Sequence, residues 1–250
     1  HIKMKRLEYF LVILLSLFVL AFSFYPIYSR YKSTPSDRVY VGTTYYTADY
    51  AGYVSNIEQG IKGRWTYSDK FTTEKVPETF LYYPYLLLGH IAGILGISSI
   101  LMYHLSRFVF GAIYLFLIYW LIRIIFPPAS VIASPERSEG RGNLNNRLLR
   151  RPALRDFLAM TKRLVAFILV LFSSSWPQIN NGILSVAKLS QAVAEVQVVN
   201  RFVIQPHFLL GNIFLVLGII LFLKYLEKPE NKYVIFSGLL VFLVTVFRPS

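Results

Sequence analysis

A long uncharged segment near the start of the chain limits what this sequence can fold into. Tyr9 to Ser29 contains no charged residue, and its length matches the ~20 apolar residues that a helix needs to cross a bilayer. Apolar runs recur at 108–122, 208–223 and 233–247. With 55% hydrophobic and 16% charged residues, the chain is too apolar for an ordinary soluble domain. The sequence predicts an all-α, polytopic integral membrane protein with about five or six transmembrane helices and a partly helical first extracytoplasmic loop.

The charged residues indicate orientation in a membrane rather than nucleic-acid binding. The net charge is +13, but the basic residues lie mostly at the ends of apolar segments, and we expect no nucleic-acid partner. The absence of cysteine excludes disulfides and thiolate chemistry, and the four histidines have no metal-ligand spacing. The metal requirement therefore stays open, with a divalent cation as one candidate cofactor.

Basic residues before the first apolar segment predict a cytoplasmic N-terminus and a multi-pass location in the cell membrane. Lys3, Lys5 and Arg6 precede the segment, which we expect to remain as an uncleaved anchor. Residues 79–106 are uncharged and apolar but broken by Pro84, Gly89, Gly93 and Gly96. They allow two interpretations: two spans joined by a tight turn near 98–102, or an interfacial helix followed by one span. The positive-inside rule favours the second, because it places Arg123 in the cytoplasm.

Composition divides the chain into three regions. Residues 1–126 hold the first membrane helix, the first extracytoplasmic loop and the following helices. Residues 127–162 form a basic insert, expected to be disordered or weakly helical, whose wording (PERSEGRGN) resembles translated intergenic repeats. The other interpretation of the insert is a cytoplasmic loop that touches anionic lipid. Residues 163–250 supply further membrane helices, and the abrupt end in an apolar run predicts a fragment.

The first outer loop, 29–78, carries nearly half of the chain's acidic residues among many tyrosines. Within it, apolar residues recur at helical spacing between Asp49 and Ile61, which predicts an amphipathic helix on the membrane surface. Asp49 falls in its first turn. A carboxylate there is suited to act as a general base or to hold a cation, and its alternative role is an ordinary helix-capping aspartate. Glu74 is the second candidate acid.

A resemblance to a known family is carried by several motifs in order. They are D-x-x-G-Y-x-x-x-I-x-x-G-x-x-G-x-W from Asp49 to Trp65, F-T-x-E ending at Glu74, and Y-P-Y-L-L-L-G-H at 83–90. Y-H-L-S-R ends at Arg107, and Q-P-H-F-L-L-G at 205–211 contains His207. Outside about 127–162, the chain resembles uncharacterised bacterial members of the polytopic GT-C glycosyltransferases. That family moves a sugar from a polyprenyl-phosphate donor to an extracytoplasmic acceptor.

The resemblance implies roles for the candidate site residues. Asp49 corresponds to the family's first-loop acid, a general base. Arg107 would bind the donor phosphate, with snorkelling to the membrane interface as its alternative. His207 would lie beside the donor or cap the following helix. Three aromatic residues would stack on sugar or prenyl groups: Tyr53, Trp65 and Tyr83. Their alternative role is to anchor the chain as members of the aromatic belt at the membrane interface.

Two functional hypotheses remain open at this point. The first is a membrane glycosyltransferase whose partners are a polyprenyl-phosphate sugar donor and the lipid bilayer. A variant of this hypothesis is that the chain, as a fragment with an inserted segment, is inactive. The second is a non-catalytic membrane protein, either a structural or a transport component. Transport is the weaker variant, because the sequence has no internal repeat and no charged pair within spans.

Overall fold

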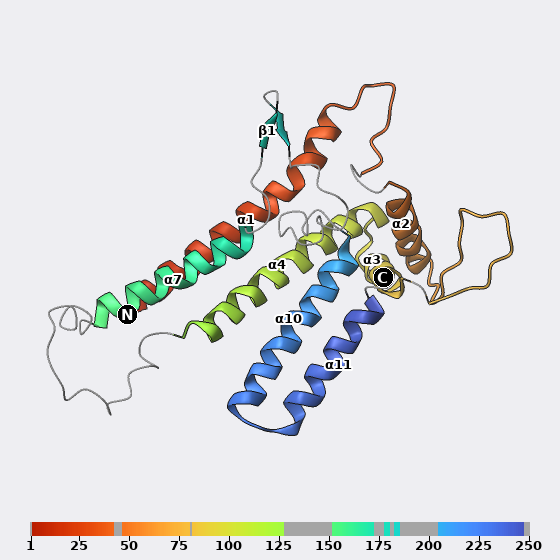
Figure 1. The fold of residues 1–250 in the computed structure, drawn as a ribbon. Coiled ribbons are helices and arrows are strands. Elements are labelled where there is room, and N and C mark those ends of the chain that lie inside the picture. Colours follow the sequence, from red (N-terminus) through yellow and green to blue (C-terminus); the bar gives the residue numbers. More distant parts are fainter. Residues whose placement is uncertain are drawn as a thin grey trace, which may run out of the picture. The chain divides into compact units, whose positions relative to one another are not determined.

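The computed structural model describes residues 2–42, 47–80, 82–127, 152–172, 178–180, 183–185 and 205–247 (Figure 1). Apart from two three-residue strands, its regular elements are α-helices. The helices are α1 (Ile2–Lys32), α2 (Thr47–Ile61), α3 (Tyr83–Leu95), α4 (Ser99–Ile125), α7 (Pro152–Phe172), α10 (Pro206–Glu227) and α11 (Asn231–Phe247). The strands β1 (Gln178–Asn180) and β2 (Ile183–Ser185) pair antiparallel. The helical fold expected from the apolar runs is confirmed for the described residues.

Three of these helices are long and apolar enough to cross a membrane. They are Arg6–Lys32 within α1, Ser99–Ile125 and Pro206–Glu227. α3 and α11 are apolar but shorter. At 1.5 Å rise per residue, the 27 residues of α4 extend about 40 Å, whereas the 13 residues of α3 extend about 20 Å, less than a hydrocarbon core of ~30 Å. The structure thus supports a helical membrane protein with these three candidate spans.

The ambiguous stretch 79–106 contains the whole of α3 and the start of α4. α3 begins after Tyr82, a non-glycine residue with a φ of 56°, and has Pro84 in its first turn. It ends at Gly96, whose φ of 66° suits glycine because no Cβ obstructs the left-handed conformation. α4 starts at Ser99 and continues unbroken to Ile125. These lengths agree with the interpretation of a short helix followed by one span.

The described residues fall into two compact units. One contains those of 1–19 and 115–199, and the other contains those of 20–114 and 200–250. The second unit has a core of buried side chains from α2, α3 and α4. It also includes the hairpin of α10 and α11 (Figure 1). In that hairpin, the hydroxyl of Ser237 donates to the carbonyl of Gly218 over 2.8 Å, a polar link of the kind that joins membrane helices.

α2 and α3 cross with their backbones in contact at two glycines. A Cβ on Gly60 would lie 2.2 Å from the carbonyl oxygen of Leu86, and one on Gly89 would lie 2.2 Å from that of Ile57. The predicted amphipathic helix is therefore present, but α3 covers its apolar face where we expected the membrane surface. Gly89 does not break α3 as the sequence suggested. It allows the close approach.

The first unit is joined by a buried ion pair between helices distant in sequence. The guanidinium of Arg163 on α7 donates to both carboxylate oxygens of Glu8 on α1, over 2.5 and 2.8 Å. The Tyr119 hydroxyl of α4 donates to the same carboxylate over 2.6 Å. α7 begins at Pro152, so the last residues of the expected insert, 152–162, are helical. The prediction for 128–151 lies outside the described residues.

Candidate functional site

Asp49 lies where the sequence predicted it, in the first turn of α2. Its side chain is exposed, and among the described residues its carboxylate forms no hydrogen bond or ion pair. It lies at the edge of a cluster of buried tyrosines. Burial raises the pKa of the Tyr53 phenol above its usual range, and the charges of Tyr82 and Asp49 add to this effect. The structure therefore presents an exposed carboxylate beside an aromatic surface that is held by the core.

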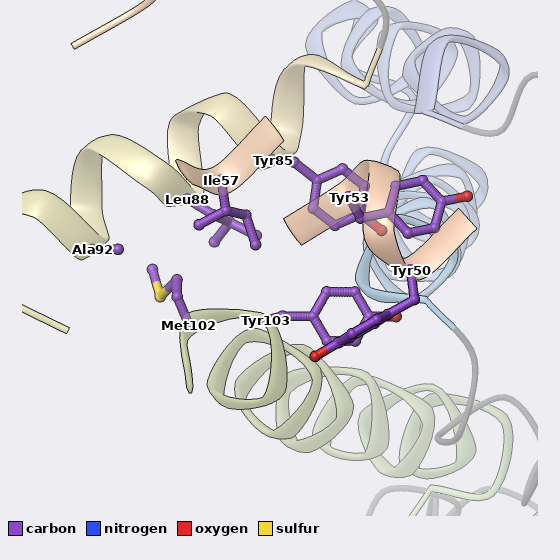
Figure 2. Close-up of a cluster of buried hydrophobic side chains, with 8 residues drawn as sticks. All are labelled: Tyr50, Tyr53, Ile57, Tyr85, Leu88, Ala92, Met102 and Tyr103. Carbon is purple, nitrogen blue, oxygen red and sulfur yellow. The ribbon is translucent and has the colours of Figure 1, made fainter. Parts of the chain in front are cut away.

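Tyr53 and His207 are brought together by α2, α3 and the start of α10. The Tyr53 ring stacks on that of Tyr85 with centroids 4.5 Å apart and lies 5.2 Å from the His207 ring. Figure 2 shows the two tyrosines as neighbours. The Tyr85 hydroxyl shares a hydrogen bond of 2.7 Å with Nδ1 of His207. Tyr53 and His207 are only 5% and 4% exposed. One face of Tyr53 is thus occupied by Tyr85, and His207 uses Nδ1 to bind a tyrosine of α3.

Arg107 is buried in the same unit, with 4% of its surface exposed. Its guanidinium lies 5.1 Å from the centre of the Phe24 ring, a cation–π contact. Nη1 of Arg107 donates to Nδ1 of His104 over 3.3 Å, and Nε2 of His104 contacts the carbonyl of Gly42 at 2.8 Å. A snorkelling arginine would have an exposed side chain, whereas this one is directed into the unit. A buried guanidinium is a strong recognition group for phosphate oxygens.

Trp65 and Glu74 belong to the loop 62–80 that links α2 to α3. Trp65 is 57% exposed and stacks on the His90 ring of α3 at a centroid distance of 4.0 Å. Glu74 is exposed, and its backbone N–H donates to the Thr72 hydroxyl over 3.1 Å. Its carboxylate makes no hydrogen bond or ion pair with a described residue. Trp65 thus has a free aromatic face, and Glu74 is open to solvent.

A buried glutamine fixes the base of this loop to α2. The side-chain amide of Gln59 accepts from the N–H of Ser68 and donates to its carbonyl, both over 3.0 Å. Tyr67 and Thr79 then pair as an antiparallel bridge with bonds of 2.8 and 3.0 Å. The loop therefore leaves the helix at a defined point and returns to it.

Besides His104, several tyrosines that the sequence interpretation did not select as site residues act electrostatically on Arg107: Tyr103, Tyr40, Tyr50 and Tyr85. A sequence signal existed for Tyr103 and His104, because they precede Arg107 by four and three residues and so share its face of α4. The other three tyrosines approach through tertiary packing. No group of three or more metal-ligating side chains occurs within the described residues.

The arrangement combines an exposed base with a buried cation. Asp49 is open to a hydroxyl-bearing substrate, while the electrostatic influence of both Asp49 and Arg107 extends to Tyr103 on α4. Such a site can remove a proton at its edge and stabilise negative charge deeper inside.

Comparison with known proteins gave no match to a protein family, to a curated protein or to a solved structure.

Proposed function

We propose that this chain is a membrane sugar transferase of the GT-C type that uses a polyprenyl-phosphate donor and an acceptor outside the cytoplasm. The observation that carries the proposal is the exposed carboxylate of Asp49 at the edge of the tyrosine cluster that also contains the buried Arg107. The order of the sequence motifs supports the same assignment.

In the proposed reaction, Asp49 takes the proton from an acceptor hydroxyl. The acceptor oxygen attacks C1 of the donor sugar and inverts it, and the bond from C1 to the phosphate oxygen breaks. The polyprenyl phosphate leaves with the electron pair, and Arg107 stabilises its charge. Trp65 offers an exposed ring on which a sugar can stack, and Glu74 is the second acid. Tyr53 and His207 support the site from the core.

The test is sugar transfer in proteoliposomes from polyprenyl-phosphate sugars to a labelled acceptor. Asp49→Asn should lower the rate by at least about a hundredfold, because general-base catalysis contributes 10²–10⁴-fold. Glu58→Gln is the matched control, since Glu58 lies on the same helix and pairs with Lys62 at 3.2 Å. Full activity in Asp49→Asn would refute the assignment of the base.

A non-catalytic membrane protein is the second candidate function. The burial of Tyr53 and His207 favours it, because neither ring can reach a substrate without repacking of the core. In that case the wild-type protein would transfer no sugar from any polyprenyl-phosphate donor, and Asp49→Asn would change neither folding nor function.

We further propose about five or six spans with the N-terminus in the cytoplasm, in which α7 and α11 join the three long helices as spans. The chain has no native cysteine, so single introduced cysteines report topology without background. Gly140→Cys should resist a membrane-impermeant maleimide applied to intact cells, and Ser36→Cys, in the exposed segment after α1, should react. Labelling of residue 140 from outside would overturn this topology.

A further inference from the structure

Two buried tyrosine hydroxyls near Arg107 have no hydrogen-bond partner among the described residues. They belong to Tyr50, in α2, and Tyr40, in the segment between α1 and α2. Tyr50 is only 6% exposed, so its hydroxyl has lost water without a replacement. An unsatisfied buried polar group destabilises the fold, and such groups call for an explanation.

Both hydroxyls lie in the surroundings of one guanidinium. The hydroxyl oxygen of Tyr50 would be 2.5 Å from a Cβ on Gly42, the residue whose carbonyl contacts His104. Tyr40 precedes Gly42 by two residues. The positive charge of Arg107 acts on both phenols: burial raises the pKa of Tyr50 to about 12 and that of Tyr40 above its usual value, while Arg107 opposes the rise in each. The two phenols therefore remain donors at neutral pH.

His104 contacts the guanidinium with one ring nitrogen and the backbone of Gly42 with the other. Because Arg107 can only donate, Nδ1 of His104 accepts, which leaves the proton on Nε2 to be donated to the Gly42 carbonyl. The Tyr50 ring packs edge-on against Tyr103 with centroids 4.9 Å apart, and Figure 2 shows it extending from α2 toward α4. The backbone at position 42 has a φ of +92°, a conformation that favours glycine. A Cβ at this position would also clash with the Tyr50 hydroxyl.

We propose that Tyr40 and Tyr50 donate hydrogen bonds to a phosphate monoester bound by Arg107, and that His104 is the positioning residue for this site. The choice of a prenyl phosphate as the ligand rests on the proposed function. The recognition chemistry is that of two neutral donors beside a fixed cation, which suits an oxyanion with several acceptor oxygens.

The test is equilibrium binding to the purified full chain in detergent, with three probes. Farnesyl phosphate carries both the prenyl chain and the phosphate, farnesol lacks the phosphate, and inorganic phosphate lacks the chain. Wild-type protein should bind farnesyl phosphate at least about tenfold more tightly than farnesol, the factor expected for a charge-assisted hydrogen bond. Tighter binding of inorganic phosphate than of farnesyl phosphate would assign the site to the free anion and overturn the lipid ligand.

Single hydroxyl deletions then locate the donors. Tyr40→Phe and Tyr50→Phe should each weaken the binding of farnesyl phosphate about fivefold to tenfold and leave the binding of farnesol unchanged. The matched control is Tyr28→Phe, at an exposed tyrosine of α1, which should change neither. A variant that merely loosened the fold would weaken the binding of both probes. The diagnostic quantity is therefore the ratio of the two affinities. Unchanged ratios in both variants would overturn the proposal.

Two substitutions separate the contacts of His104. His104→Asn retains an acceptor at the position of Nδ1, toward Arg107, whereas His104→Gln retains a donor at the position of Nε2, toward Gly42. If His104 positions the guanidinium, the Asn variant should keep more of the phosphate preference than His104→Ala. Equal ratios for wild type and His104→Ala would exclude this role. Binding without sugar transfer would refute the proposed function but leave the phosphate site standing.

Discussion

The backbone contact between α2 and α3 gives the sharpest test of the fold, through Gly60→Ala. The new Cβ would lie 2.2 Å from the Leu86 carbonyl oxygen and 2.9 Å from the Cα of Gly89, whereas ordinary contact begins at 3.4 Å. The helices must therefore separate by about 1 Å at this point, and neither obstructing atom belongs to a flexible side chain. Overpacking of this kind costs about 1–3 kcal/mol.

Gly52→Ala is the matched control, because it lies on the same helix and its Cβ would meet nothing within 4 Å. Both substitutions gain the same helix propensity, about 1 kcal/mol, so the difference between them isolates the contact. We expect Gly60→Ala to be about 1–3 kcal/mol less stable than Gly52→Ala.

The assay is equilibrium unfolding in mixed micelles titrated with a denaturing detergent and followed by far-UV circular dichroism. Gly89→Ala should be destabilising as well, and the double variant Gly60→Ala/Gly89→Ala should cost less than the sum of the two, since one separation relieves both clashes. Equal stability of Gly60→Ala and Gly52→Ala would show that the helices do not meet at these glycines and would refute the reasoning.

Three further predictions concern buried polar groups. Arg163→Met should lower the free energy of unfolding by about 3–5 kcal/mol because it leaves the Glu8 carboxylate buried without its cation, and Glu8→Gln in that background should recover part of the loss in the same detergent titration. Burial raises the pKa of Tyr50 in the folded protein from 10.0 to about 12. The stability that depends on the neutral phenol is therefore present below pH 10 and is lost as the pH rises toward 12. The difference between the 295-nm titrations of wild type and Tyr50→Phe should have its midpoint near 12, and a midpoint near 10 would contradict this burial. Gln59→Ala should speed hydrogen exchange at Ser68 by about tenfold or more, since it removes both bonds to that residue; unchanged exchange would mean that the loop is held elsewhere.

The sequence was sufficient for features that depend on local pattern. The uncharged run from Tyr9 predicted α1, and the apolar spacing between Asp49 and Ile61 predicted α2 with Asp49 in its first turn. The three long candidate spans follow from uncharged apolar runs. These predictions succeeded because helix periodicity and span length are set by neighbours a few residues apart.

The same local pattern misjudged features that depend on a partner surface. Gly89 looked like a helix breaker, although it lies inside α3 where Gly60 approaches. The apolar face of α2 predicted a membrane surface, but it is covered by α3. Glycine and apolar side chains fit several environments, so the residues alone do not tell which neighbour will fill the space.

Only the tertiary structure decided which distant residues meet. Tyr85 and His207 share a hydrogen bond across 122 positions, and Glu8 and Arg163 form an ion pair across 155. The sequence selected Asp49 through a helix start and Arg107 through the family resemblance, one at a time, and no pattern in it indicated that Tyr40 and Tyr50 lie near Arg107. Local periodicity determines where helices form, whereas long-range packing determines which of their side chains converge, because that choice depends on how whole helix surfaces fit together.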